Sequence, residues 1–262
     1  LRWTLGLGTT AAIAVMTVAL IPAVRATGFR FRWRFQPRHP VVKRLMVLSG
    51  WTLGYVLANQ LVILVVRNLS VPGSSGSTAY YNAFAFFVLP HGLLAMSVAT
   101  TFVPELARAV TAKDKAAFIG RFTLGVRIIG LLTIPAGVAL FVLRLPLIGL
   151  LLQRGNFTEA DTWHAAYALA GFALGLGGFS IYLFALRGFY SHQDTRTPFI
   201  LNVGQCVLNI VLALVLHSRY GVMGLGAAFA VSYVIAAAWA LVVLSYKVPG
   251  YAARATIVGL VQ

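Results

Sequence analysis

The sequence predicts an all-α, polytopic transmembrane helix bundle with about seven spans. Of its 262 residues, 60% are hydrophobic and only 10% are charged, and the mean hydropathy is +0.86. Soluble globular proteins carry about 25% charged residues, because a folded globule needs a wettable exterior. Apolar stretches of span length recur along the chain, and Lys and Arg gather in alternate connections between them. These observations together favour a membrane protein.

Each predicted span is about the length that crosses a bilayer, which is roughly 20 mostly apolar residues. The seven stretches run approximately 3–24, 45–66, 80–103, 122–143, 165–186, 199–216 and 222–246. The residues after Lys247 look like the start of a further segment that is cut short.

The basic residues predict the orientation of the spans. Residues 25–44 hold seven Lys and Arg, residues 104–127 five, residues 187–198 two and the tail from 247 two. The opposite connections hold one, two and one, together with Arg2. Positive loops stay in the cytoplasm, so the N-terminal end of the chain is expected outside. We therefore expect that residue 1 is not the natural start and that earlier spans are missing.

The net charge of +16 has two explanations. In a soluble protein it would suggest nucleic acid, but here the basic residues lie between apolar runs, which favours membrane topology and anionic lipid head groups. Residues 28–40 alternate aromatic and basic side chains, which suits either the membrane interface or a plain basic loop, with RNA binding a distant third. Residues 71–78 read as a flexible outside turn. No nucleic-acid partner is expected.

Polar side chains inside the spans are candidates for a transport path, because polar groups at membrane depth are costly. The sixth predicted span carries Asn202, Gln205 and Asn209, whose spacing of three and four places them on one helical face. Such residues either line a hydrated cavity or form hydrogen bonds between helices, and for this span we favour the hydrogen bonds. The candidates for cavity lining are Asn59, Gln60, Tyr81 and His91.

His91 directly follows Pro90, which removes a backbone donor from the helix. The imidazole either titrates or bonds a carbonyl that Pro90 leaves exposed, and the second interpretation is preferred. Two pairs of glycines four residues apart, Gly50 with Gly54 and Gly171 with Gly175, predict close contact between helices.

The spans contain no acid pair, metal cluster or nucleophile–base arrangement, so we expect neither an enzyme nor a metal site or cofactor. Glu159 and Asp161 lie in an outside loop and are weak evidence for acid–base chemistry. Thr158 or Asp161 is a plausible N-cap of the fifth predicted helix.

Three segments resemble the MurJ (MviN) family of lipid II flippases, within the MATE-like and polysaccharide-flippase superfamily. They are YYNAFAFFVLPHGLLAMSVATTFVPELAR (80–108), LLQRGNFTEADT (151–162) and FYSHQDTRTP (189–198). The residues that match the family's outside-loop motif are Gly155, Phe157 and Thr158. The residues that match its cytoplasmic motif are Phe189, Tyr190, Gln193, Asp194, Thr197 and Pro198.

The resemblance implies a 14-helix fold with two six-helix lobes and two extra helices. Residues 1–24 would be the last helix of the N-terminal lobe and 25–44 the basic cytoplasmic linker between lobes. Residues 45–246 would be the six-helix C-terminal lobe and 247–262 the start of a further segment. The implied role is translocation of lipid II, an undecaprenyl-diphosphate-linked disaccharide-peptide, across the bacterial inner membrane. The implied partners are that glycolipid, membrane lipids and the missing N-terminal lobe.

The sequence departs from the family at one position. The family often carries an essential Arg a few residues before the Pro of the second helix in this lobe, and that place holds Ala85. Arg67, near the outer end of the second predicted span, is a candidate substitute for the cation that would meet the diphosphate.

The leading mechanism is alternating access, in which two lobes rock around a cavity at the membrane midplane. The alternatives are a flippase for another polyprenyl-linked glycan, a drug exporter of the same superfamily, and a non-transporting scaffold of cell-wall assembly. The absence of Asp and Glu from the predicted spans counts against an exporter of cationic drugs.

Overall fold

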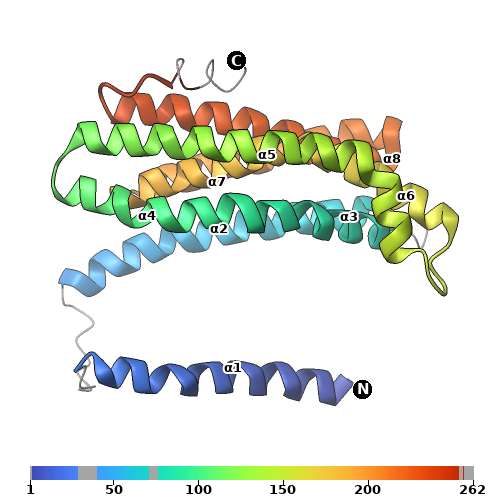
Figure 1. The fold of residues 1–262 in the computed structure, drawn as a ribbon, viewed down its shortest axis with the longest axis horizontal. Coiled ribbons are helices and arrows are strands. Elements are labelled where there is room, and N and C mark those ends of the chain that lie inside the picture. The colour runs from blue at the N-terminus through green and yellow to red at the C-terminus, as the bar shows by residue number, and fades with distance from the viewer. Residues whose placement is uncertain (1, 29–39, 71–75, 254–255, 257–262) are drawn as a thin grey trace. The chain divides into compact units, whose positions relative to one another are not determined.

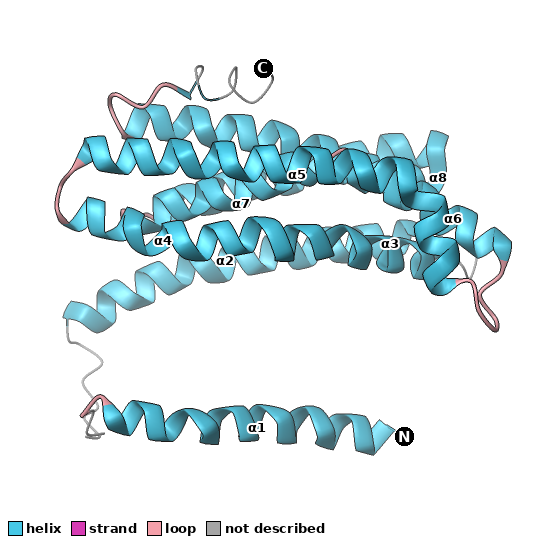
Figure 2. Ribbon diagram, in the orientation of Figure 1, coloured by secondary structure: helices cyan, strands magenta, loops and turns pink. Residues whose placement is uncertain are grey.

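The computed structural model describes residues 2–28, 40–70, 76–253 and 256, and every regular element among them is a helix (Figure 2). The chain divides into two compact units, residues 1–45 and 46–262. The expectations for segment 29–39 and for residues 71–75 lie outside the described residues. The helices are α1 (Arg2–Ala26), α2 (Pro40–Ser70), α3 (Gly76–Pro90), the π-helix η1 (His91–Ala95), α4 (Met96–Thr111), α5 (Lys115–Leu152), α6 (Glu159–Ala173), α7 (Leu176–Ser191) and α8 (Arg196–Lys247).

Helix α1 is apolar on all its faces, and from Leu7 onward its large side chains are exposed within its own unit. A helix that is hydrophobic all round lies in a protein core or in lipid. Its mean hydropathy of 2.0 over residues 6–26 makes it a candidate span, as the sequence predicts.

Helix α8 is 52 residues long and consists of two antiparallel arms. The backbone reverses at Gly221, where φ is +57° and ψ is −135°. Glycine adopts this left-handed region at little cost because it has no Cβ. Across the hairpin, Gln205 donates a hydrogen bond of 3.1 Å to the hydroxyl of Ser232. The arms correspond to the predicted spans 199–216 and 222–246.

The described residues contain six candidate membrane spans, or seven when the two arms of α8 are counted separately. Four continuous helical stretches are long and apolar enough to be spans, namely 6–26, 40–70, 78–111 and 115–152. Helices α6 and α7 together make a fifth crossing that bends by 50°. Helix α8 is one 52-residue candidate, and its two arms match the last two predicted spans when they are counted separately. The predicted span 165–186 is a broken helix rather than a straight one.

The break between α6 and α7 lies against the second arm of α8. A Cβ built on Gly175 would lie 2.5 Å from Cα of Ala230, and one on Gly171 would lie 2.6 Å from the backbone nitrogen of Ala227. These contacts confirm the predicted close approach at this glycine pair. Gly54 likewise faces the ring of Phe199, whereas no atom lies within 4 Å of the Cβ position of Gly50.

The core of the second unit is rich in aromatic rings. One group joins α3, α6, α7 and α8, and another joins α5 to α7, where Phe122 and Phe184 stack at 5.4 Å. Tilted and edge-to-face rings at 4.5–7 Å stabilise a core beyond their buried area. Gly125 makes room for Phe184, because a Cβ there would lie 2.4 Å from the ring.

The connections of the bundle alternate between its two ends (Figure 1). The α4–α5 turn, the α7–α8 turn and the C-terminal end of α8 lie at one end, while the α5–α6 loop and the reversal within α8 lie at the other. The more basic connections of this unit therefore share one end, as alternation of spans requires.

Candidate functional site

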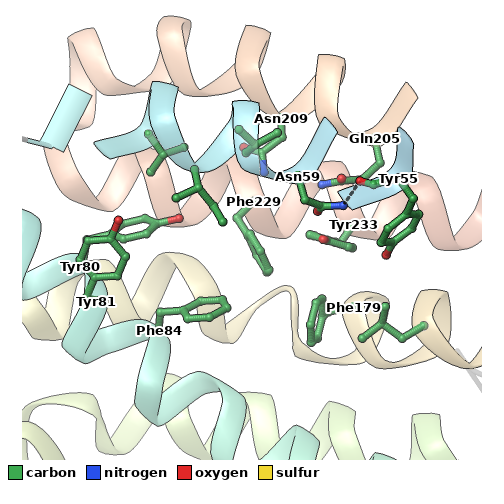
Figure 3. A pocket seen from close by; sticks show the side chains of 14 residues that line it. Tyr55, Asn59, Tyr80, Tyr81, Phe84, Phe179, Gln205, Asn209, Phe229 and Tyr233 are labelled. Carbon is green, nitrogen blue, oxygen red and sulfur yellow. Dashed lines mark hydrogen bonds between the residues drawn. The ribbon is translucent and has the colours of Figure 1, made fainter. Parts of the chain in front are cut away.

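A pocket of about 360 Å³ lies between α2, α3, α7 and both arms of α8 (Figure 3). Its walls are mostly aromatic and aliphatic, with a few carboxamides, which is the usual composition of a small-molecule site. The lining residues are Tyr55, Asn59, Val62, Ile63, Val66, Tyr80, Tyr81, Phe84, Phe179, Leu183, Gln205, Asn209, Phe229 and Tyr233.

The aromatic wall of the pocket is preorganised by ring packing. Phe229 lies 4.5 Å from Tyr233 and 5.8 Å from Phe84, measured between ring centroids. Phe179 lies 4.9 Å from Tyr233. Tyr81 differs from these rings because it is 45% exposed, so it stands at the accessible edge of the pocket.

The polar row predicted on one helical face lies along the first arm of α8, and two of its members bind other helical segments. Asn59 donates a hydrogen bond of 3.2 Å to the side-chain oxygen of Asn202, which joins α2 to α8. Gln205 joins the two arms through Ser232. These bonds confirm the preferred structural interpretation for Asn202 and Gln205.

The third member of the row behaves differently. Asn209 is 2% exposed and lines the pocket, yet its side-chain oxygen has no hydrogen-bond partner among the described residues. An unpaired buried acceptor is costly, so native structures contain few of them. Its position makes it a candidate ligand contact.

The pocket brings together two of the five predicted cavity residues, Asn59 and Tyr81. Gln60 follows Asn59 by one residue, about 100° around the helix, and its side chain is exposed outside the pocket. Arg67 is exposed in the last turn of α2, also outside the pocket. Among the described lining residues, none carries a charge.

His91 also lies outside the pocket. The prediction that it bonds a backbone carbonyl is wrong, because its described partner is a side chain. Its Nδ1 lies 2.9 Å from the hydroxyl of Ser180 on α7, rather than against a carbonyl freed by Pro90. The ring packs on Phe179 at 4.7 Å. After Pro90 the backbone takes a π-helical turn, in which the nitrogen of Met96 donates to the His91 carbonyl and so pairs it internally. Such turns occur frequently at functional sites.

A second hollow, an apolar groove of about 400 Å³, lies between α5, the α6–α7 break and the second arm of α8. Its described lining contains no polar side chain and includes three glycines. The lining residues are Ile134, Gly137, Val138, Ala173, Leu174, Gly177, Gly178, Ile181, Val234, Ala237, Ala238 and Leu241.

The α5–α6 loop motif builds a helix start. Thr158 is the N-cap of α6, and a capping box pairs its side chain with Asp161. This confirms the N-cap prediction for Thr158. Gly155 has a φ of +58°, which favours glycine, and Phe157 packs half-buried against the core.

The α7–α8 motif forms a polar latch, which consists of Asp194, Thr197 and Lys247. Asp194 accepts hydrogen bonds from the backbone nitrogen of Thr197 at 3.0 Å and from its hydroxyl at 2.7 Å. Lys247, at the end of the second arm of α8, pairs with the same carboxylate. Burial alone would raise the pKa of Asp194, but the hydrogen bonds from Lys247 and Thr197 outweigh it, so the pKa lies below its ordinary value.

Two other residues of this motif, Gln193 and Pro198, lie where the backbone turns and where α8 begins. Gln193 has a φ of +58° in the turn itself, and Pro198 follows Thr197 in the first turn of α8. Pro is well tolerated there because the first backbone donors of a helix have no partner within it.

Ala85, at the place of the family Arg, is exposed on α3 and does not line the pocket. The sequence did not single out the aromatic lining residues, such as Tyr55, Phe84 and Phe179, as site residues. In a chain with 17 Phe and 10 Tyr, aromatic residues in apolar spans carry no local signal for a pocket. Only the packing of α2, α3, α7 and the two arms of α8 identifies them.

Known proteins with similar sequences point to one family. The family described as Lipid II flippase MurJ matches residues 2–262. A probable lipid II flippase MurJ from Rhizobium meliloti (strain 1021) is 31% identical over 84% of this chain and 41% of the relative. Another from Vibrio cholerae serotype O1 is 30% identical over 81% of this chain and 41% of the relative. The chain thus spans less than half the length of these two relatives.

The fold agrees with this grouping. A solved structure of lipid II flippase MurJ in an inward closed conformation superposes with a TM-score of 0.69 at 24% identity. The match covers 88% of this chain and 49% of the solved one. The family match over almost every residue, together with this fold, shows that the chain belongs to the MurJ lipid II flippase family.

Proposed function

We propose that this chain supplies the C-terminal lobe of a flippase that moves lipid II across the bacterial inner membrane. The observation that carries the proposal is the family match over residues 2–262. The chain spans 41% of the relative from Rhizobium meliloti and 49% of the solved MurJ chain, which fits one lobe of a two-lobe transporter. The N-terminal lobe is then its principal partner, with α1 as the last helix of that lobe and residues 25–44 as the linker.

The distribution of charge supports an orientation for the lobe. Arg108, Lys113 and Lys115 lie around the α4–α5 turn, and Lys247 lies at the same end of the bundle (Figure 1). Positive connections stay in the cytoplasm, so we place this end inside the cell. The α5–α6 loop with Gly155 and Thr158 is then periplasmic.

Two helix irregularities support alternating access. The π-turn at His91–Ala95 and the break between α6 and α7 are linked by the His91–Ser180 contact. Irregular backbone within a membrane is tolerated where protein buries it, and broken helices are common at transport sites. We assign these irregularities to the bending of the lobe as the cavity opens to one side and then to the other.

The charge of the pocket bears on where the diphosphate of the glycolipid binds. A diphosphate needs cationic partners, and the described lining of the pocket is uncharged. We therefore propose that cations outside this pocket bind the diphosphate. Arg67 is a candidate for this binding because its side chain is exposed.

The test of the proposal uses the full-length protein that carries this chain. It is reconstituted in vesicles loaded with lipid II, and appearance of lipid II in the opposite leaflet is measured with a periplasmic-side enzyme or label. We expect lipid II to be translocated faster in vesicles that contain the protein than in protein-free vesicles. We also expect the protein to restore growth when the cell's own flippase is depleted. Translocation of a different polyprenyl-linked glycan but not lipid II would contradict the assigned substrate, and no translocation of either would support a scaffold.

A further inference from the structure

The most informative unexplained group in the bundle is the side-chain oxygen of Asn209. It belongs to a residue that is 98% buried, on the first arm of α8, and it has no hydrogen-bond partner among the described residues. The two neighbouring carboxamides on the same face, of Asn202 and Gln205, each have a side-chain partner on another helical segment. Asn209 lines the pocket, as Gln205 does, but without such a partner (Figure 3).

The chemistry of the pocket limits what can pair with this oxygen. A prenyl chain has no donor, so it would leave the acceptor buried and unpaired. A diphosphate presents only acceptor oxygens near neutral pH, and no described lining residue is a cation that would hold it. The fitting group is uncharged and carries an N–H or O–H donor.

The remaining walls of the pocket specify the shape of that group. The rings of Tyr81 and Phe84 come from one side of the pocket on α3, and the ring of Phe229 comes from the second arm of α8. Aromatic faces carry partial negative charge, and the C–H face of a sugar ring carries the complementary partial positive charge. A volume of about 360 Å³ is at the lower end of the range for small-molecule sites, which suits one ring rather than a whole glycolipid.

We infer that this pocket is a carbohydrate subsite, in which the carboxamide of Asn209 forms a hydrogen bond with a hydroxyl or acetamido group of one neutral sugar ring. The inference rests on the proposed function, since the ring would belong to the disaccharide of the translocated glycolipid. Tyr81, at the accessible edge, stacks on the entering ring. Asn209 then selects for a donor-bearing headgroup, because a site built to hydrogen-bond its ligand rejects a ligand that lacks the bond.

The test measures binding to the full-length protein in nanodiscs with two probes. Lipid II carries the sugars, whereas undecaprenyl diphosphate has the same tail and diphosphate without them. We expect Asn209→Leu to weaken lipid II binding about tenfold and to leave undecaprenyl diphosphate binding unchanged. Asn82→Leu is the matched control, because Asn82 is a half-buried residue of α3 that does not line the pocket.

A second pair of variants guards against misfolding. Tyr81→Leu removes an exposed ring and should weaken lipid II binding alone, whereas Tyr81→Phe keeps the ring and should bind nearly as wild type. The melting temperature of Asn209→Leu should stay level or rise, since the unpaired acceptor is replaced by an apolar group of similar size.

The alternative outcomes are distinct. Equal weakening of both probes by Asn209→Leu would assign the pocket to the tail or the diphosphate and overturn the carbohydrate subsite. If Asn209→Leu and Tyr81→Leu both bound the two probes as the wild type does, the pocket would be only a water-filled cavity. That result would also overturn the carbohydrate subsite. If the wild-type protein binds lipid II no better than empty nanodiscs do, the proposed function itself fails.

Discussion

Two hollows of similar volume in the same bundle have opposite chemistry. The pocket beside α2 holds carboxamides and tyrosines among large rings, and its described lining has no glycine. The groove beside the α6–α7 break is lined by aliphatic side chains and contains Gly137, Gly177 and Gly178. Polar groups within a membrane face the protein interior or a hydrated path, while small apolar residues serve close helix packing. From this difference we propose that the pocket is the functional side of the bundle and the groove its packing side.

The largest expected effect is a loss of folding from the groove. A Cβ on Gly137 would lie 2.6 Å from the backbone oxygen of Ala173, which cannot move without shifting α6. We expect Gly137→Leu to destabilise the bundle by about 3 kcal/mol or more, measured by reversible unfolding in detergent. Ala238→Leu is the control, since Ala238 is exposed in the same groove. Equal stability of the two variants would remove the packing role of the groove.

A smaller effect is expected from the bond that holds α2 beside the pocket. Asn202 is fully buried, and its carboxamide is bonded to Asn59 and to the Tyr55 carbonyl. Asn202→Leu should cost about 1 kcal/mol of unfolding free energy, because hydrogen bonds between membrane helices contribute modestly. If Asn209→Leu lost as much stability as Asn202→Leu, the distinction between a structural and a ligand-facing carboxamide would be wrong.

The polar latch at the end of α8 should give a pH-dependent effect below about 1 kcal/mol, since Asp194 is partly solvated. The folded-state pKa of Asp194 is lowered, so its stabilisation is present above the unfolded value of about 3.8 and is lost as pH falls through the folded pKa. Asp194→Asn should therefore lower the melting temperature at pH 7 but not at a pH below that folded value. A constant difference between variant and wild type across pH would show that the carboxylate charge is not responsible.

The smallest effect is expected at the ion pair of Arg121 and Glu105, neither of which lines the pocket or the groove. The pair remains solvated, with 47% of the Arg121 side chain and 36% of the Glu105 side chain exposed. Glu105→Gln should change the unfolding free energy by less than about 0.5 kcal/mol at physiological salt. A loss as large as that from Asp194→Asn would mean that exposed pairs and the latch contribute alike.

The sequence predicted the apolar helices that are candidate spans, because the length and hydropathy of each helix are local properties. It also predicted the helix start at Thr158, since capping depends on a few neighbouring residues. The sequence predicted a close helix contact at Gly171 and Gly175 but not the break between α6 and α7, because the contact of Gly175 with Ala230 on another helix cannot be read from neighbouring residues.

The candidate site was predicted in part. Asn59 and Tyr81 line the pocket, but polarity alone did not separate Asn59 from its neighbour Gln60, which faces the other way. His91 found a side-chain partner on α7 that spacing along the chain does not reveal. Which of three equivalent carboxamides on α8 lacked a partner depended on Ser232 and Asn59, which are distant in sequence.

We propose that the pocket, and not the groove, serves lipid II translocation. The most direct measurement compares the translocation rate of lipid II by reconstituted full-length protein carrying Tyr81→Leu with that of Ala238→Leu. We expect a several-fold slower rate for Tyr81→Leu and a wild-type rate for Ala238→Leu. Equal rates for the two variants, or a slower rate only for the groove variant, would contradict it.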